Sequence, residues 1–198
     1  MNNKVVVLVV ALIILAGGGF YGYKYFQGKA KSPLAGQTVK VEGYDVNYGN
    51  DGESATITDP KTGAKMMTGP NLKVPSSFPK EIPVYSNGKV TVISLDPKFP
   101  LISVSTKDDV KTVQDWYQAD LQKKGWTLTA NQMIGPDAAH IEFENTNNMG
   151  SLIVTKDDET KGTIITLSSM TREEAQKMFK GVMGGEQKEE TPDSEQKD

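Results

Sequence analysis

The chain has 198 residues, enough for one ordinary domain or two small ones beside short accessory segments. Its net charge of -3 comes from residues 184–198, and the nearly neutral remainder argues against a nucleic-acid partner. Because the chain has no cysteine, disulfides, cysteine metal sites and a lipid-modified amino-terminal cysteine are excluded.

Residues 5–23 form a long stretch without a charged side chain, flanked by Lys4 and Lys24. As a helix this stretch would span roughly 28 Å, close to the hydrocarbon thickness of a bilayer. Aromatic residues cluster at positions 20–26, as they do at membrane interfaces. We therefore predict a transmembrane anchor within residues 1–26. The alternative is a cleaved secretory signal, but no cleavage site directly follows the apolar run.

Two features of the sequence favour opposite orientations of the anchor in the membrane. Lysines at positions 24, 29 and 31 outnumber Lys4, so the positive-inside rule alone favours a cytoplasmic carboxyl end. Short amino-terminal anchors with one following domain nevertheless usually export that domain, and long domains translocate largely regardless of charge. We expect a single-pass membrane protein with an extracytoplasmic carboxy-terminal domain.

A linker rich in glycine, serine and proline is predicted at residues 27–37. Apolar and polar residues then alternate between turn signals at 49–52 and 59–63, which indicates a small β-rich stretch over residues 38–69.

An α+β module is predicted for residues 70–170. Prolines between 70 and 83 predict an extended surface segment, with Phe78 and Ile82 packed on the core. Two strands follow, at 90–95 and around 102–104.

One helix dominates the middle of the module. Thr106 or Asp108 is expected to cap it, and Gly125 occupies the position expected just after its end. Its apolar residues share one face, which should cover a sheet: Val110, Val113, Tyr117 and Leu121.

Four strands are predicted after this helix, at 126–133, 139–145, 151–156 and 163–168. In the first of them Trp126, Leu128 and Ala130 are expected to point inward. Because short turns join these strands, they must be antiparallel. The Thr171-x-x-Glu174 capping pattern opens an amphipathic helix at 171–183, and an acidic tail predicted to be disordered follows at 184–198.

Residues 78–85 read Phe-Pro-Lys-Glu-Ile-Pro-Val-Tyr, residues 116–121 read Trp-Tyr-Gln-Ala-Asp-Leu, and Gly125-Trp126 follow. Over about residues 75–170 the chain resembles uncharacterised bacterial membrane-anchored envelope proteins with a small helix-on-antiparallel-sheet module. The resemblance implies an envelope location and that fold, and it carries no assigned site.

Few residues are candidates for chemistry. His140, the only histidine, shares a strand face with Glu142 and Glu144, but residues two apart lie about 6.6 Å apart along a strand, too far to grip one metal unaided. Residues 45–52 superficially resemble a calcium loop, but the glycine comes late and no glutamate closes the loop. We predict no catalytic residue, no metal site and no cofactor.

Two apolar groups could instead contact a ligand or partner. Trp116 and Tyr117 could line a groove between helix and sheet, although aromatic residues at helical spacing are more often core. Met178 and Phe179 form part of an apolar stripe with lysines beside it, which could lie on a membrane or partner.

The predicted fold class is α+β: one main helix packed on an antiparallel sheet, preceded by a transmembrane helix and a short β-rich stretch. The predicted function is a non-catalytic binding or scaffolding module, held at a membrane by residues 5–23 and partnered by another envelope protein. The alternative is a small-ligand-binding module with its groove between helix and sheet. The sequence does not indicate an oligomeric state.

Overall fold

The computed structural model describes residues 34–158 and 160–183. The predicted anchor at 5–23 and the acidic tail at 184–198 lie outside the described residues. Within the described ranges, no helix is long and apolar enough to cross a membrane.

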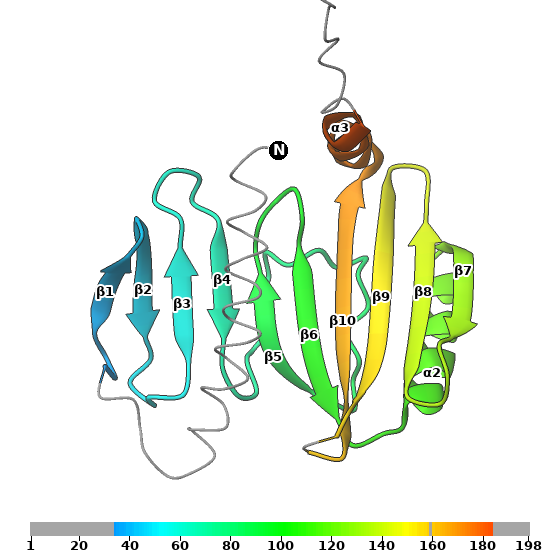
Figure 1. Ribbon diagram of the computed structural model, residues 1–198, viewed down its shortest axis with the longest axis horizontal. Coiled ribbons are helices and arrows are strands. Elements are labelled where there is room, and N and C mark those ends of the chain that lie inside the picture. Colours follow the sequence, from blue (N-terminus) through cyan, green and yellow to red (C-terminus); the bar gives the residue numbers. More distant parts are fainter. Residues whose placement is uncertain (1–33, 159, 184–198) are drawn as a thin grey trace, which may run out of the picture.

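The described residues form one ten-stranded antiparallel sheet and two helices (Figure 1). The strand order is β1-β2-β3-β4-β5-β6-β10-β9-β8-β7. The strands are β1 (Thr38–Val41), β2 (Tyr44–Tyr48), β3 (Ala55–Thr58), β4 (Lys65–Thr68), β5 (Lys89–Ser94), β6 (Leu101–Thr106), β7 (Thr127–Met133), β8 (Ala138–Glu144), β9 (Asn148–Asp157) and β10 (Gly162–Thr171). The helices are α2 (Val110–Lys123) and α3 (Arg172–Met183).

The predicted fold class is wrong. The residues expected to form a short β-rich stretch before the sheet are part of the sheet, because β4 pairs with β5 and places Met67 opposite Ile93. Antiparallel strands, rather than one main helix and its sheet, therefore dominate the described chain. Residues 69–88 separate the two paired strands, so no short turn marks this pairing in the sequence. The domain boundaries assigned around this stretch stay a prediction.

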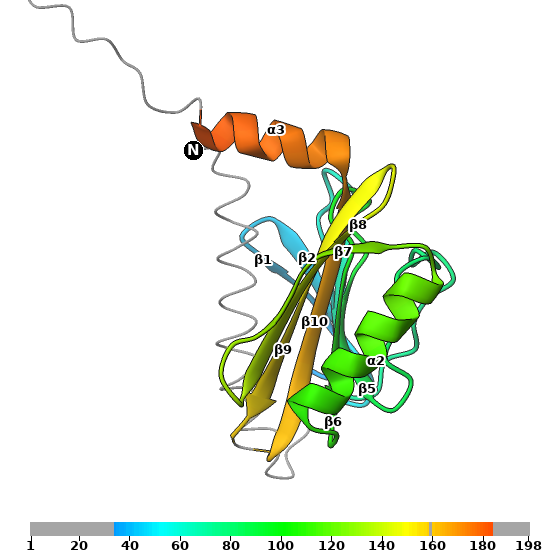
Figure 2. The same ribbon diagram turned by 90° about the vertical axis from the view of Figure 1, so that its right-hand side faces the viewer.

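Helix α2 packs on β7, β8 and β9, on one side of the sheet (Figure 2). Asp109 is its N-cap, since the carboxylate accepts a hydrogen bond from the backbone N–H of Thr112 at 2.8 Å. The expected caps, Thr106 and Asp108, are occupied by other partners described below. Gly125 ends the helix with a positive φ of 83°, as predicted. The predicted apolar face is buried: Val110, Val113, Tyr117 and Leu121.

A bulge in β7 changes one predicted side-chain direction. The pairing with β8 shifts between Leu128 and Ala130, so that Asn131, and not Ala130, lies opposite Ile141 on the side that α2 covers. Asn131 there accepts a hydrogen bond from Gln114 of α2 at 2.6 Å. The inward position expected for Ala130 is therefore wrong.

Residues 69–88, which we call the strap, connect β4 to β5 and cover part of the core. Phe78 and Ile82 are buried in the main hydrophobic cluster, as predicted. The indole N–H of Trp126 donates to the backbone carbonyl of Glu81 at 3.1 Å, which links the strap to the end of α2. The strap thus belongs to the core beside α2.

Helix α3 begins at the predicted capping residue, because the backbone N–H of Glu174 donates to the hydroxyl of Thr171 at 3.1 Å. Arg172 pairs with Glu144 at 2.9 Å and so attaches the start of α3 to β8. The structure describes the backbone of α3 to Met183 but not the side chains of residues 178–183.

Candidate functional site

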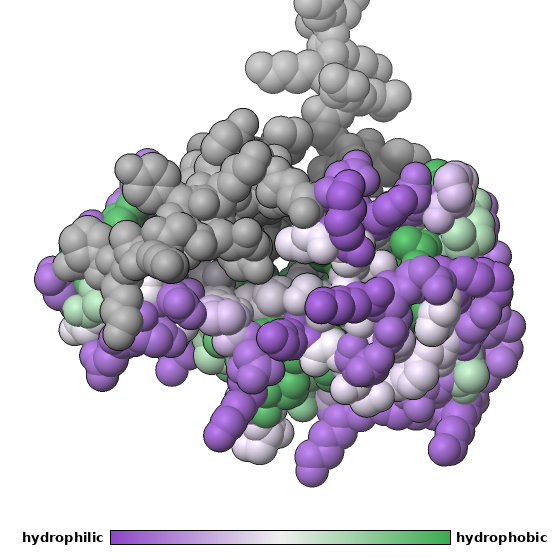
Figure 3. All heavy atoms as spheres, turned by 90° about the horizontal axis from the view of Figure 1, so that it is seen from below, coloured by the Kyte–Doolittle hydropathy of each residue, from purple (hydrophilic) through white to green (hydrophobic). Residues whose placement is uncertain are grey.

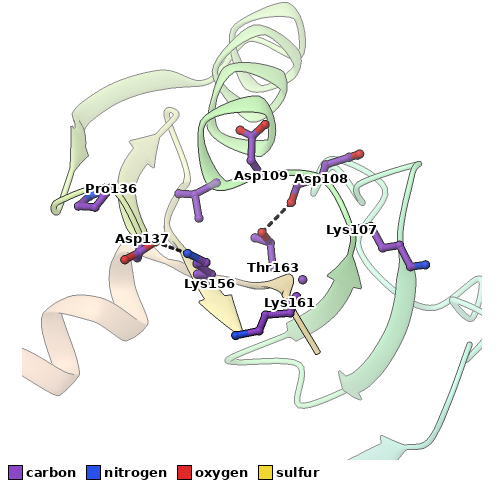
Figure 4. A pocket seen from close by; sticks show the side chains of 10 residues that line it. Lys107, Asp108, Asp109, Pro136, Asp137, Lys156, Lys161 and Thr163 are labelled. Carbon is purple, nitrogen blue, oxygen red and sulfur yellow. Dashed lines mark hydrogen bonds and ion pairs between the residues drawn. The ribbon is translucent and has the colours of Figure 1, made fainter. Parts of the chain in front are cut away.

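A pocket of about 200 Å³ opens at the lower end of the sheet in Figure 1, where α2 begins. Three connections form it: the β6–α2 loop, the β7–β8 turn and the β9–β10 turn (Figure 4). Figure 3 shows this end of the molecule, where hydrophilic side chains cover much of the surface. The three connections that line the pocket are far apart in the sequence.

The three carboxylates of this pocket already have partners. Asp109 caps α2, and its hydrogen bond from the Thr112 amide lowers the pKa of the carboxyl group. Asp137 pairs with Lys156 at 3.0 Å, which raises the pKa of the lysine (Figure 4). Asp108 accepts hydrogen bonds from two side chains of the strap, described next. No carboxylate of the pocket lacks a partner.

Asp108 joins the strap and β10 to the β6–α2 loop at the edge of the pocket. Its Oδ2 accepts hydrogen bonds from the Tyr85 hydroxyl at 2.6 Å and from the Asn87 amide at 2.7 Å. Its backbone carbonyl accepts one from Thr163 of β10 at 2.6 Å (Figure 4). The hydroxyl of Thr106 donates to the Asn87 carbonyl at 2.7 Å. Because their side chains make these contacts, neither Thr106 nor Asp108 caps α2 as predicted.

Asp108→Asn is expected to destabilise the protein near neutral pH. Hydrogen bonds from Tyr85 and then Asn87 lower the pKa of Asp108 below that of an unfolded aspartate, about 3.9. The stabilisation is thus present above that value and is lost as pH falls through the folded-state pKa. Urea unfolding should show a difference between variant and wild type that shrinks from pH 7 towards roughly pH 2. Asp115→Asn, which removes an exposed pair with Lys111, is the control. A difference that is constant over this range would contradict the assignment.

Two of the three pocket lysines have no ion pair in the described part of the chain. Lys107 and Lys161 are exposed, whereas Lys156 is paired with Asp137. Figure 4 shows Lys107 extending away from the pocket. Lys161, in the β9–β10 turn, is thus an exposed lysine at the rim of the pocket without an ion pair among the described residues.

Trp116 and Tyr117, the predicted ligand contacts, belong to an aromatic cluster at the edge of the core. Tyr117 is completely buried, and its ring packs edge-on against Trp116 with centroids 4.8 Å apart. Tyr85 of the strap lies against both rings, at 5.0 Å from Trp116 and 6.1 Å from Tyr117. Neither predicted contact lines the pocket at the start of α2. Met178 and Phe179 have side chains outside the described part of the structure.

His140 lies on the side of the sheet opposite α2. Its Nε2 is 3.0 Å from the hydroxyl of Ser151 and 3.9 Å from a carboxylate oxygen of Glu142. A nucleophile–base–acid relay needs the two partners on different ring nitrogens, but here the same nitrogen meets both. This geometry does not form a catalytic triad.

The turn that resembles a calcium loop is held by its own hydrogen bonds. Asp51 accepts from the backbone N–H groups of Glu53 and Ser54, both at 2.9 Å. Among the described residues, no group of three or more histidine, aspartate or glutamate side chains could hold a metal ion.

A second pocket, of about 360 Å³, lies between the β3–β4 turn, the strap and the β5–β6 loop. Prolines line much of it, and Asp96 is the one charged residue in its lining. Sequence reasoning identified neither pocket, because spacing along the chain does not report which turns meet at one end of a sheet.

One comparison with known proteins gives a match. A family model described as START domain-like matches residues 86–168, which run from the end of the strap into β10. The chain is similar to this family over that helix-plus-sheet segment, which is less than half of its length. No curated protein and no solved structure matches significantly.

Proposed function

We propose that the protein is a small-ligand-binding module whose site is the pocket at the start of α2. A START-like domain suggests a ligand-binding module, and all ten residues lining this pocket fall within the matched segment. The second pocket draws five of its nine lining residues from the chain before that segment. The position of the first pocket within residues 86–168 is the observation that carries the proposal.

The charges of the pocket indicate the class of ligand. Its carboxylates are engaged by α2, Lys156, Tyr85 and Asn87, whereas Lys161 has no ion pair within the described ranges. Among the described residues, the charged group without an ion pair at the rim of the pocket is therefore the ammonium of Lys161, so the ligand carries an anionic group. A volume of about 200 Å³ is below the roughly 300–1,000 Å³ of pockets for drug-sized ligands. The pocket would accept a small anion or the anionic end of a larger molecule.

Lys161→Gln is expected to weaken anion binding by about two- to fivefold, the loss typical of one exposed ion pair. Acetate, succinate and inorganic phosphate would be titrated into the full-length protein, with chemical shifts of backbone amides recorded by NMR. Shifts should concentrate in the β6–α2 loop, the β7–β8 turn and the β9–β10 turn.

Lys65→Gln is the matched control, since this exposed lysine on β4 lines neither pocket. Equal affinities for the two variants, or shifts confined to other parts of the sheet, would contradict the proposed site.

This proposal favours the ligand-binding alternative over the scaffolding function. The membrane anchor, the extracytoplasmic location, the envelope partner and the absence of enzymatic activity stay predictions from the sequence.

A further inference from the structure

The two halves of the sheet have their apolar residues on opposite sides. Cross-strand partners share a side of an antiparallel sheet. One row of partners lies on the side that α2 covers and is apolar from β8 to β4 but polar on β3 and β2: Ile141, Leu152, Leu167, Ile102, Ile93, Met67, Thr56 and Asn47.

The neighbouring row, on the other side of the sheet, shows the reverse pattern. It is mostly polar from β8 to β5, with Leu101 the exception, and apolar from β4 to β1: Glu142, Ser151, Ser168, Leu101, Ser94, Met66, Ile57, Val46 and Val39. Strands β1–β3 therefore turn their apolar residues away from the side on which α2 and the strap lie, and β4 has one methionine on each side, with Met67 towards the core and Met66 away from it.

These residues form a continuous apolar surface, which we call the outer patch: Val39, Val41, Tyr44, Val46, Tyr48, Ala55, Ile57 and Met66. Seven of the eight are half-buried and Val41 is 49% exposed, so each of them keeps part of its surface accessible. Four strands at about 4.8 Å spacing make the patch roughly 14 Å wide. Contiguous apolar surfaces of this kind mark interaction sites.

The elements described above pack elsewhere. Helix α2 packs on β7–β9 and α3 on β9 and β10. The buried strap residues Phe78 and Ile82 belong to the core on the α2 side. The outer patch thus needs a partner that none of these elements provides.

The chain itself contains a matching apolar segment, residues 5–23, which has 19 consecutive residues without a charge. The described chain enters beside the patch, because the Gly36 amide donates to the carbonyl of Tyr48 at 3.1 Å. Residues 24–33 connect the two and can extend to roughly 34 Å, more than the width of the patch.

We propose that residues 5–23 pack against the outer patch and shield it from water. A short tether gives an effective concentration on the order of millimolar, whereas a second copy must lose translational and rotational freedom to bind. Docking also removes both apolar surfaces from water at once. The segment predicted to enter a bilayer thus has a partner within its own chain.

Disulfide cross-linking of the full chain tests this contact, since no native cysteine interferes. Each of Leu12, Ile13, Ile14 and Leu15 would be changed to cysteine in turn, together with Ile57→Cys. The control pairs each of them with Thr56→Cys, whose side chain points to the α2 side of the same strand. At least one Ile57 pair should form an intramolecular disulfide about tenfold faster than its Thr56 counterpart.

Equal rates for the two series would overturn the proposal. Cross-links found only between chains would overturn it in favour of a second copy. Protein recovered entirely on phosphatidylcholine–phosphatidylglycerol vesicles, with the Ile57 pairs unlinked, would overturn it in favour of a bilayer. Anion titration with Lys161→Gln tests the ligand pocket separately, because Lys161 is not part of the outer patch.

Discussion

Tyr117→Ala is expected to lower the free energy of unfolding by about 3–5 kcal/mol, the usual cost of removing a buried aromatic ring. The side chain is completely buried and packs against the rings of Trp116 and Tyr85. Alanine would leave a cavity where α2 and the strap meet. Urea unfolding followed by tryptophan fluorescence and far-ultraviolet circular dichroism measures the loss.

Tyr117→Phe, which keeps the ring, is expected to leave stability unchanged or to raise it by up to about 1 kcal/mol. The buried hydroxyl has no hydrogen-bond partner in the described part of the protein. The Tyr85 amide approaches it without forming a hydrogen bond, and burial raises the pKa of the phenol. A loss above 1 kcal/mol for Tyr117→Phe would show that the hydroxyl is satisfied, for example by an ordered water.

Tyr117 shows how far the helical spacing of apolar residues predicts structure. The same helical spacing made Tyr117 both a core residue and a candidate ligand contact. Spacing identified the buried face of α2, because every apolar residue assigned to that face is buried. It could not show that Tyr85, from a segment 32 positions earlier, packs on the Tyr117 ring. Periodicity within one element reports which face is buried but not what lies against it.

The sheet shows the same limit at a larger scale. Strands joined by short turns, such as β8 and β9, were predictable because turn residues and alternation are local signals. The pairing of β4 with β5 was not, since the strap separates them. The bulge in β7 reversed the expected side for Ala130 because one extra residue changes the alternation.

The candidate pocket lay beyond sequence reasoning for a related reason. Lys161, Thr163 and Asp137 come from two separate turns and a strand end, with no motif spacing between them. Each looks like an ordinary polar turn residue. Only the antiparallel order β10-β9-β8 brings the three to one end of the sheet.

Phe78→Ala in the strap is expected to destabilise the whole sheet by about 3–5 kcal/mol. Phe78 precedes the segment that matches the START domain-like model, yet it is buried in the same hydrophobic cluster as Ile102 and Leu121 of that segment. If the strap only connected β4 to β5, removing the Phe78 ring would leave the fold of residues 86–168 intact. Because the Phe78 ring is part of the core of residues 86–168, the variant should unfold at a lower urea concentration, in one cooperative transition.

Val74→Ala is the matched control, since Val74 lies in the same strap but is 39% exposed, and its effect should stay within about 0.5 kcal/mol. Fluorescence of Trp116 and Trp126 reports on α2 and its end, while circular dichroism reports on the whole sheet. Coincident transitions for both signals would show that strap and matched segment fold as one unit. If Phe78→Ala cost no more than Val74→Ala, the helix-plus-sheet segment would not depend on the strap, and its core would close without residues from outside the family match.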